Sequence, residues 1–295
     1  MASKSYRALF FNTSLARNNT RYCLRDILPA LVANHTSHQP HLPVSNISNT
    51  DFQIRDVAVI GAASNVIQGV FGRLRDDAPN KIDNSGNESQ LALLPTDKLV
   101  EKCYFLYFAN TDILVWQSSR DVASPERFAE YLSTLISNFC SAPHIFNLLP
   151  IVDPNSLQRV LNGSVKSIEC KVARPNTPVS NQPLWNQNAF DLMNSVNGAT
   201  IKINVSAARG ILQNTSSLIT QLVSDNNVSL LKVKIDGDDD PIDLFADRVD
   251  ERFTVNLNGH YPLAQDVLNH LDSAYNNQRN LLISYFDQRQ AQSFP

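Results

Sequence analysis

Two arginines placed two residues apart are the first residues in this chain whose type and spacing suggest chemistry. Arg73 and Arg75 follow Gly72 and precede Asp76 and Asp77. On an extended segment, side chains two positions apart point to the same face, so both guanidinium groups can meet one anion. The adjacent aspartates offer a competing interpretation, in which the arginines form ordinary surface ion pairs. Both interpretations stay open on the sequence alone.

A second basic set falls on predicted strands in the C-terminal half. Between residues 166 and 234 the chain carries seven lysines and arginines against three acids. Lys202 shares a strand face with Asn204, and Lys232 shares one with Lys234, so adjacent strands can present a positive surface suited to phosphates. An ordinary solvated sheet face explains the same pattern. The residues that we predict to contact phosphate are Arg73, Arg75, Lys171, Arg174, Lys202, Lys232 and Lys234.

One alternative is a catalytic set for metal-dependent hydrolysis. Asp153 precedes a predicted strand that carries Glu169 and Lys171. Nucleases of this type hold a divalent metal between two carboxylates, and the lysine orients the attacking water. The same Glu-x-Lys pattern also arises on solvated strands as a surface pair. We therefore expect a binding protein rather than an enzyme, and keep the nuclease as the alternative.

The acidic segment 236–251 contains eight acids against one arginine. Its first carboxylates alternate as in a calcium loop, but Pro241 stands where an EF-hand requires glycine. We predict a solvated acidic loop followed by a short helix near Pro241. The sequence also lacks a phosphate-cradling glycine loop and a nucleophile elbow, so we predict no cofactor and no bound metal.

Composition limits the class of protein. The chain has 295 residues, 43% of them hydrophobic, which is enough for two folded domains. Its net charge of −3 excludes a protein that coats nucleic acid through overall charge, so any basic surface must be local. The four cysteines are widely spaced and indicate reduced thiols rather than a zinc site. No signal peptide or membrane span is recognisable, and we expect a cytoplasmic protein without direct membrane insertion.

The hydrophobic patterns predict an α+β fold of two mixed domains, residues 1–154 and 155–295, with largely antiparallel sheets. Predicted strands cover residues 6–11, 52–60, 66–74, 101–108, 113–117, 164–174, 199–207, 228–235 and 253–257. Predicted helices cover residues 24–34, 157–161, 184–196, 215–224 and 263–286, with a further helix from Pro125. The long terminal helix is amphipathic, and we expect it to pack on its own domain rather than on a second copy.

Four segments resemble the RexA-like phage exclusion proteins and their phage and prophage relatives. They are residues 70–79, 99–108, 168–175 and 241–248, and the order of elements is also similar. The resemblance implies a homodimer that binds double-stranded DNA without sequence specificity and acts in abortive infection or antiphage defence. It also implies a possible membrane-protein partner encoded nearby. A third possibility, from the residues themselves, is a non-enzymatic interaction module that uses the terminal helix and the acidic segment.

Overall fold

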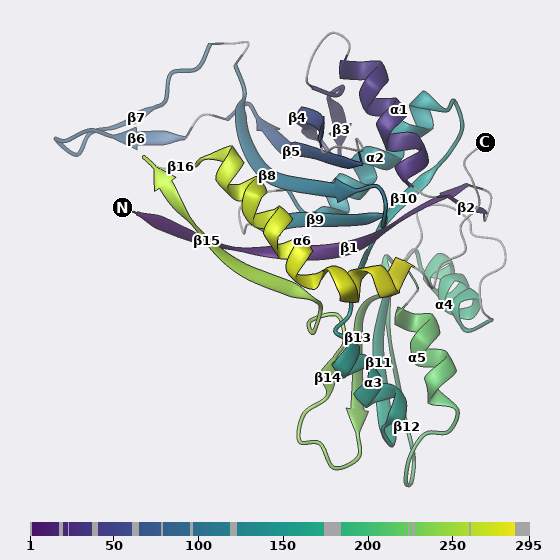
Figure 1. The fold of residues 1–295 in the computed structure, drawn as a ribbon. Helices are drawn as coiled ribbons and strands as arrows, with labels where there is room; N and C mark the ends of the chain where they lie inside the picture. The colour runs from purple at the N-terminus through teal and green to yellow at the C-terminus, as the bar shows by residue number, and fades with distance from the viewer. Residues whose placement is uncertain are drawn as a thin grey trace. The chain divides into compact units, whose positions relative to one another are not determined.

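The computed structural model confirms the α+β class, with mostly antiparallel sheets and a C-terminal helix (Figure 1). The residues that it describes are 2–17, 20–22, 24–36, 41–60, 65–77, 79–94, 97–118, 123–173, 184–223, 225, 228–259 and 261–286. The chain forms two compact units, and the division differs from the predicted single boundary at residue 154. Unit 1 comprises residues 1–148 and 250–295, and unit 2 comprises residues 149–249. The last strand and helix therefore belong to the same unit as the N-terminus.

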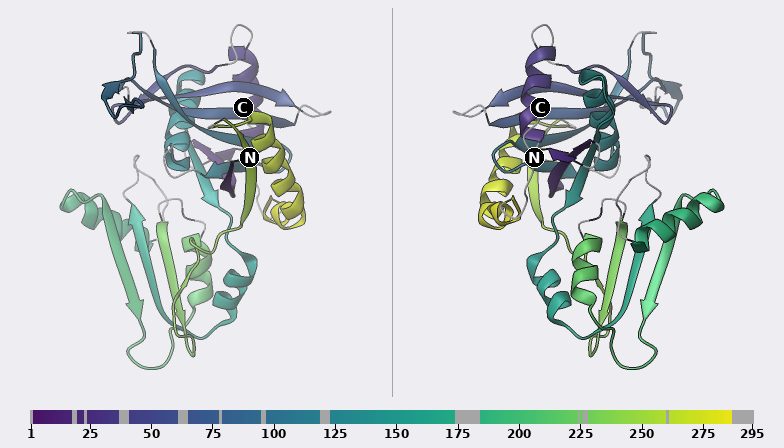
Figure 2. Two further views of the ribbon diagram at one scale, coloured as in Figure 1. Left: turned by 90° about the vertical axis from the view of Figure 1, so that its left-hand side faces the viewer. Right: turned by 90° about the vertical axis from the view of Figure 1, so that its right-hand side faces the viewer.

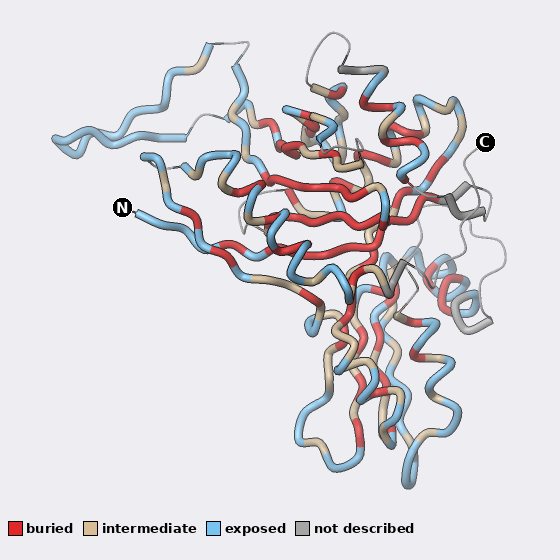
Figure 3. The backbone as a smooth tube through the Cα atoms, in the orientation of Figure 1, coloured by how far each residue is buried: buried red, intermediate tan, exposed pale blue. Residues whose placement is uncertain are grey.

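Unit 1 is built on one large antiparallel sheet. Its path runs β16-β15-β1-β9-β8-β5-β4-β3, with β10 and β2 also paired to β1. The strands are β1 (Ser3–Arg17), β2 (Thr20–Tyr22), β3 (Ser45–Ile47), β4 (Thr50–Ile60), β5 (Val66–Arg75), β8 (Leu99–Phe108), β9 (Ile113–Ser118), β10 (Ile145–Pro150), β15 (Asp250–Asn258) and β16 (Tyr261–Pro262). The central strands are buried on both faces, which explains their nearly continuous apolar sequences (Figure 3).

One face of this sheet is covered by helices α1 (Leu24–Thr36) and α2 (Pro125–Phe139). The centre of the core is aromatic: the ring of Phe128 on α2 packs edge-on against Phe71 of β5 and also contacts Phe105 of β8. Gly69 lies directly opposite Phe105 in the sheet. A Cβ at Gly69 would come within 2.7 Å of the Phe105 ring, so this glycine leaves space for an aromatic side chain.

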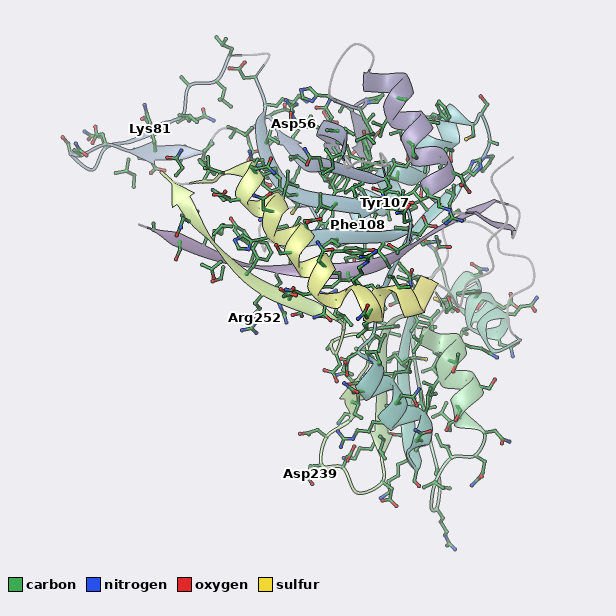
Figure 4. The ribbon with its side chains drawn as sticks, in the orientation of Figure 1. Asp56, Lys81, Tyr107, Phe108, Asp239 and Arg252 are labelled. Atoms are coloured by element: carbon green, nitrogen blue, oxygen red, sulfur yellow. The ribbon has the colours of Figure 1, made fainter. Side chains whose placement is uncertain are left out.

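Helix α6 (Ala264–Phe286) covers the opposite face of the same sheet (Figures 1 and 2). Its apolar stripe includes the buried residues Val267, Leu271 and Tyr275. Phe108 of β8, labelled in Figure 4, stacks on Tyr275 with ring centroids 3.6 Å apart. The terminal helix therefore packs within the chain, as expected, but on the N-terminal sheet rather than on the C-terminal domain predicted from the sequence.

A thin hairpin extends from unit 1 between β5 and β8 (Figure 1). Its strands, β6 (Asn80–Ile82) and β7 (Glu88–Gln90), are exposed along their whole length. Neither of these two strands was predicted from the sequence.

Unit 2 is a single layer of strands with helices on one face. The sheet order is β12-β11-β13-β14, and each neighbouring pair is antiparallel. Its elements are helices α3 (Pro154–Asn162), α4 (Leu184–Ser195) and α5 (Thr215–Val223), and strands β11 (Val165–Ala173), β12 (Thr200–Ser206), β13 (Val228–Ile235) and β14 (Ile242–Asp243). Pro241 precedes a short strand, so the helix predicted there was wrong.

The helices of unit 2 contribute Val160, Phe190 and Ile219 to a core beneath the sheet. Of the helices that the structure describes, none combines the length and the apolarity needed to cross a lipid bilayer.

Candidate nucleic-acid interface

Four of the predicted lysines lie on one face of the unit 2 sheet. Lys171 of β11 is directly opposite Lys202 of β12, and Glu169 of β11 is directly opposite Lys232 of β13. Lys234 follows Lys232 by two residues. Opposite residues in an antiparallel pair, and residues two apart on one strand, share a face. We call the set formed by Lys171, Lys202, Lys232 and Lys234 the lysine face.

The strands place these lysines outward because alternate residues enter the core. On β11, Ile168, Cys170 and Val172 are buried in the hydrophobic cluster that the helices cover. Burial, the largest cause, raises the pKa of the Cys170 thiol to about 11, so this thiol stays protonated near neutral pH. Period-two alternation on a half-buried sheet therefore assigns every second residue to the lysine face.

Two acids on the same face partly neutralise the lysines. The Nζ atom of Lys202 lies 2.9 Å from Oε1 of Glu169 on the neighbouring strand. The Nζ atom of Lys232 lies 3.9 Å from Oδ2 of Asp243, at the outer limit of an ion pair. The four lysines and these two acids leave a net charge of +2 on the face.

The other two lysines have no carboxylate partner among the residues that the structure describes. Nζ of Lys234 donates to the backbone carbonyl oxygen of Asp239. Lys171 is exposed and sits beside Lys202 across the strand pair. Like charges directly opposite one another in a sheet are destabilising. An anion bound between Lys171 and Lys202 would relieve that repulsion.

The predicted arginines lie in unit 1 and are held by carboxylates. Glu101 on β8 is directly opposite Arg73. It contacts Nη1 of Arg73 at 3.5 Å and Nη1 of Arg75 at 2.5 Å. Arg75 also donates from Nε to Oδ1 of Asp77 over 2.9 Å, and hydrogen bonding from Arg75 is the largest cause that lowers the pKa of Asp77 to about 2. This geometry favours the ion-pair interpretation of both arginines.

The neighbouring aspartate has a different partner from the one the sequence suggested. Asp76 lies 3.3 Å from Nζ of Lys98, which also contacts Asp51 at 2.7 Å. Lys98 and Glu101 were not predicted as partners, because only the pairing of β5 with β8 brings them to this strand end. Arg174, the remaining predicted contact, lies outside the described residues.

The predicted nuclease residues are not brought together. The carboxylate of Asp153 caps helix α3 and accepts from the backbone N–H of Ser156 at 2.8 Å. Helix α3 packs into the core on the buried side of the sheet, whereas Glu169 belongs to the lysine face beside Lys171. Within the described parts of the chain, no group of three or more His, Cys, Asp or Glu side chains could hold a metal ion.

The acidic segment forms an open hollow of about 530 Å³, lined largely by residues 237–243. Several of its carboxylates pair with bases of the same unit. Lys166 lies 2.7 Å from Asp236 and lowers the pKa of that carboxyl, and Arg159 lies 2.6 Å from Asp238. The second carboxylate oxygen of Asp238 is buried and has no hydrogen-bond partner among the residues that the structure describes. These ion pairs neutralise part of the negative charge that the sequence of the segment carries.

Comparison with known proteins assigns the chain to a family. A family model described as a family of unknown function, DUF6731, matches residues 9–290, so the chain belongs to that family. No curated protein matches the sequence.

Proposed function

We propose that this member of the DUF6731 family binds double-stranded DNA without sequence specificity, through the lysine face of unit 2. The observation that carries the proposal is the placement of four lysines on one face of three adjacent strands, with Lys171 and Lys202 directly opposed. Lysine contacts to phosphate supply affinity and orientation but no base discrimination.

The chemistry of the face supports binding to the DNA backbone rather than to bases. The described side chains between and beside the lysines are polar or aliphatic, as at Asn204, Ser206 and Leu230, and none is aromatic. Sequence-tolerant binding to single strands usually depends on aromatic side chains on which bases stack. A flat, basic and non-aromatic sheet face suits the regular phosphates of a duplex better.

Arg73 and Arg75 are secondary in this proposal. Both arginines contact Glu101, and Arg75 also contacts Asp77, so a phosphate would have to displace carboxylates that already satisfy them. The lysine face offers Lys171 without such competition in the described structure.

The biological setting that we propose rests on the resemblance to RexA-like proteins. In that setting the protein is a cytoplasmic homodimer that acts in phage exclusion or antiphage defence, with a possible membrane-protein partner. The lysine face gives a physical basis for the DNA-binding step alone.

A mobility-shift titration on two unrelated duplexes, at several salt concentrations, tests the proposal. We expect equal affinity for both sequences and a slope of log Kobs against log salt between about −2 and −4, because few phosphates are contacted. Lys171→Ala should weaken binding to both duplexes alike and reduce the magnitude of the slope by about 1. Lys81→Ala is the matched control, since Lys81 is an exposed lysine on the β6–β7 hairpin (Figure 4).

Three outcomes would contradict the proposal. The first is the absence of a shift at low salt, and the second is an equal loss of affinity in Lys171→Ala and Lys81→Ala. The third is magnesium-dependent cleavage that Glu169→Gln abolishes, which would restore the nuclease alternative. Salt-insensitive association with a protein partner, without DNA binding, would favour the interaction module.

A further inference from the structure

Strand β12 is an unusual sheet edge. Natural proteins protect sheet edges with very short strands, prolines or inward charges, because an open edge can pair with another chain. The edge strands β3, β14 and β16 follow this rule, with only two or three residues each. Strand β12 ends the unit 2 sheet with seven residues and contains no proline. Its sequence, Thr-Ile-Lys-Ile-Asn-Val-Ser, offers a single charge.

The hydrogen bonds of the sheet show which backbone groups of β12 face outward. The N–H of Ala207 donates to the carbonyl oxygen of Lys166 on β11 at 3.0 Å. In an antiparallel ladder, residues alternate between bonding to one neighbour and facing the other side. Residues 201, 203 and 205 therefore bond to β11, and residues 200, 202, 204 and 206 direct their backbone groups to the outer edge. Among the described residues, no strand pairs with that edge.

The sequence of β12 is chemically symmetric about Ile203. Thr200 corresponds to Ser206, Ile201 to Val205, and Lys202 to Asn204. If two copies of β12 pair antiparallel about Ile203, hydroxyl meets hydroxyl, aliphatic meets aliphatic and lysine meets amide. The four outward-facing residues of one copy then lie opposite outward-facing residues of the other, which allows about eight backbone hydrogen bonds.

Other registers of the same pairing are worse. If the centre of symmetry lay between two residues, residues whose backbone groups face the outer edge would lie opposite residues whose backbone groups face β11. The two strands could not then form backbone hydrogen bonds. A register centred on Lys202 would place the two lysines directly opposite one another, which is destabilising. A register centred on Asn204 would leave Thr200 outside the paired strand. A register centred on Ile203 therefore avoids opposed lysines and also keeps the whole of β12 in backbone hydrogen bonding.

Apolar side chains near β12 also remain exposed. Helix α4 contributes Phe190 and Met193 to the core, but Leu192 is 54% exposed, and Val196, just beyond the helix, is 68% exposed. Val205, on the helix-covered side of β12, is 43% exposed. In the symmetric register each Val205 lies opposite Ile201 of the second copy, which would shield both from water.

We infer that β12 is a self-recognition edge, and that two copies of this chain pair antiparallel through β12 about Ile203. The two unit 2 sheets then form one continuous sheet. Because directly opposite residues share a face, both lysine faces lie on the same side of that sheet, and the net charge of the joined surface doubles. This last consequence rests on the proposed function, whereas the pairing itself does not.

A proline substitution on the outer edge tests the pairing. Asn204→Pro removes an N–H that faces outward, so it deletes bonds between copies without removing one to β11. We expect sedimentation equilibrium of the full chain to show a reversible dimer, and Asn204→Pro to raise its dissociation constant at least about tenfold. Asn204→Ala, which keeps the N–H, should leave the dissociation constant nearly unchanged.

Paired cysteines test the register. In the double variant Lys202→Cys/Asn204→Cys, each new thiol lies opposite a new thiol of the second copy, at a spacing that a disulfide can bridge. We expect mild oxidation to give a covalent dimer. Thr200→Cys/Asn204→Cys carries as many thiols but places none of them opposite another, and it should remain monomeric on a non-reducing gel.

A monomer at all concentrations, or a dimer that Asn204→Pro leaves intact and the first double variant does not cross-link, would overturn the inference. DNA binding by such a protein would leave the proposed DNA-binding function standing, without the homodimer. A β12-paired dimer that fails to shift DNA would support the pairing and contradict the proposed DNA binding.

Discussion

A buried carboxylate in the turn between β8 and β9 connects several elements of unit 1. Asp112 is 4% exposed and has a positive φ of 51°. It accepts hydrogen bonds from the hydroxyl of Tyr107 and, at 3.2 Å, from the backbone N–H of Arg25 in the first turn of α1. Thr13 of β1 donates to the same carboxylate at 3.4 Å. One side chain thus joins a turn, a strand and a helix.

Replacement of this carboxylate should destabilise unit 1. Asp112→Ala removes the carboxylate that accepts hydrogen bonds from the Tyr107 hydroxyl and the Arg25 N–H, and alanine tolerates a positive φ poorly. We expect a loss of about 2–4 kcal/mol in the free energy of unfolding. Asp112→Asn keeps an acceptor and a residue that accepts this backbone conformation, so its loss should be smaller.

Urea denaturation followed by the fluorescence of Trp116, in a Trp185→Phe background, measures this loss in unit 1. Equal stability of the alanine and asparagine variants would show that the hydrogen bonds of Asp112 contribute nothing.

One ion-pair partner of the two arginines, Asp77, was predictable from the sequence, but the partner that they share was not. The ion-pair interpretation of the arginines holds for Arg75, which contacts Asp77 as the sequence suggested. The carboxylate that holds both arginines, Glu101, comes from a strand that only the folded sheet places beside them. On β11, by contrast, alternation placed Glu169 and Lys171 on one face, because a period of two needs no knowledge of distant segments.

At the scale of elements, an aromatic contact joins the middle of α6 to the sheet. Tyr275 stacks on Phe108, and its hydroxyl lies 3.0 Å from Oγ1 of Thr111 in the β8–β9 turn. The helix is amphipathic but carries many polar residues, so packing rather than propensity holds it in place. Tyr275 anchors the middle of α6 to the sheet.

Two substitutions separate the ring of Tyr275 from its hydroxyl. Tyr275→Phe removes only the hydrogen bond and should cost about 1 kcal/mol. Tyr275→Ala removes the stacked ring and leaves a cavity, and should cost about 3–5 kcal/mol. Urea unfolding monitored by the helical circular dichroism signal checks both values. Similar losses in the two variants would contradict a packing role for the ring.

Elements with a clear periodicity of apolar residues were predicted from the sequence. Short strands that form only by pairing with a distant strand were missed. The stripe of α6 and the alternation of β4 (Thr50–Ile60) are local signals. Strand β10 (Ile145–Pro150) was missed, because its assignment depends on pairing with β1. The acidic run before Pro241 indicated a helix start, but residues 242–243 pair with β13 instead. Tertiary pairing overrode the local preference there.

At the scale of the whole molecule, unit 2 is an insertion into unit 1. The chain leaves unit 1 after residue 148 and returns at Asp250, where β15 pairs with β1 in a register that joins Ser3 to Asn256. The two connecting segments run side by side: the N–H of Val249 donates to the carbonyl oxygen of Ile151 at 2.7 Å. No local sequence pattern indicates that β1 pairs with a strand some 250 residues away. Two consecutive domains were therefore predicted from the sequence.

Excision of the insertion tests this organisation. Because the entering and leaving segments are hydrogen-bonded neighbours, about 5 Å apart, a linker of about four glycine and serine residues can replace residues 149–249. We expect the shortened chain to unfold cooperatively, with Trp116 buried as in the full chain. An unfolded or aggregated product would show that unit 1 requires unit 2 to fold.

The two separated units also test where the proposed DNA-binding surface lies. The segment 149–249 carries the whole lysine face, and the shortened chain carries Arg73 and Arg75. If phosphate contacts come from the lysine face, the segment should shift duplex DNA with the salt slope of the full chain, while the shortened chain should not. A shift by the shortened chain alone would indicate that Arg73 and Arg75 bind the DNA. Phosphate would then have displaced their carboxylate partners. Loss of binding in both pieces would contradict a surface confined to unit 2.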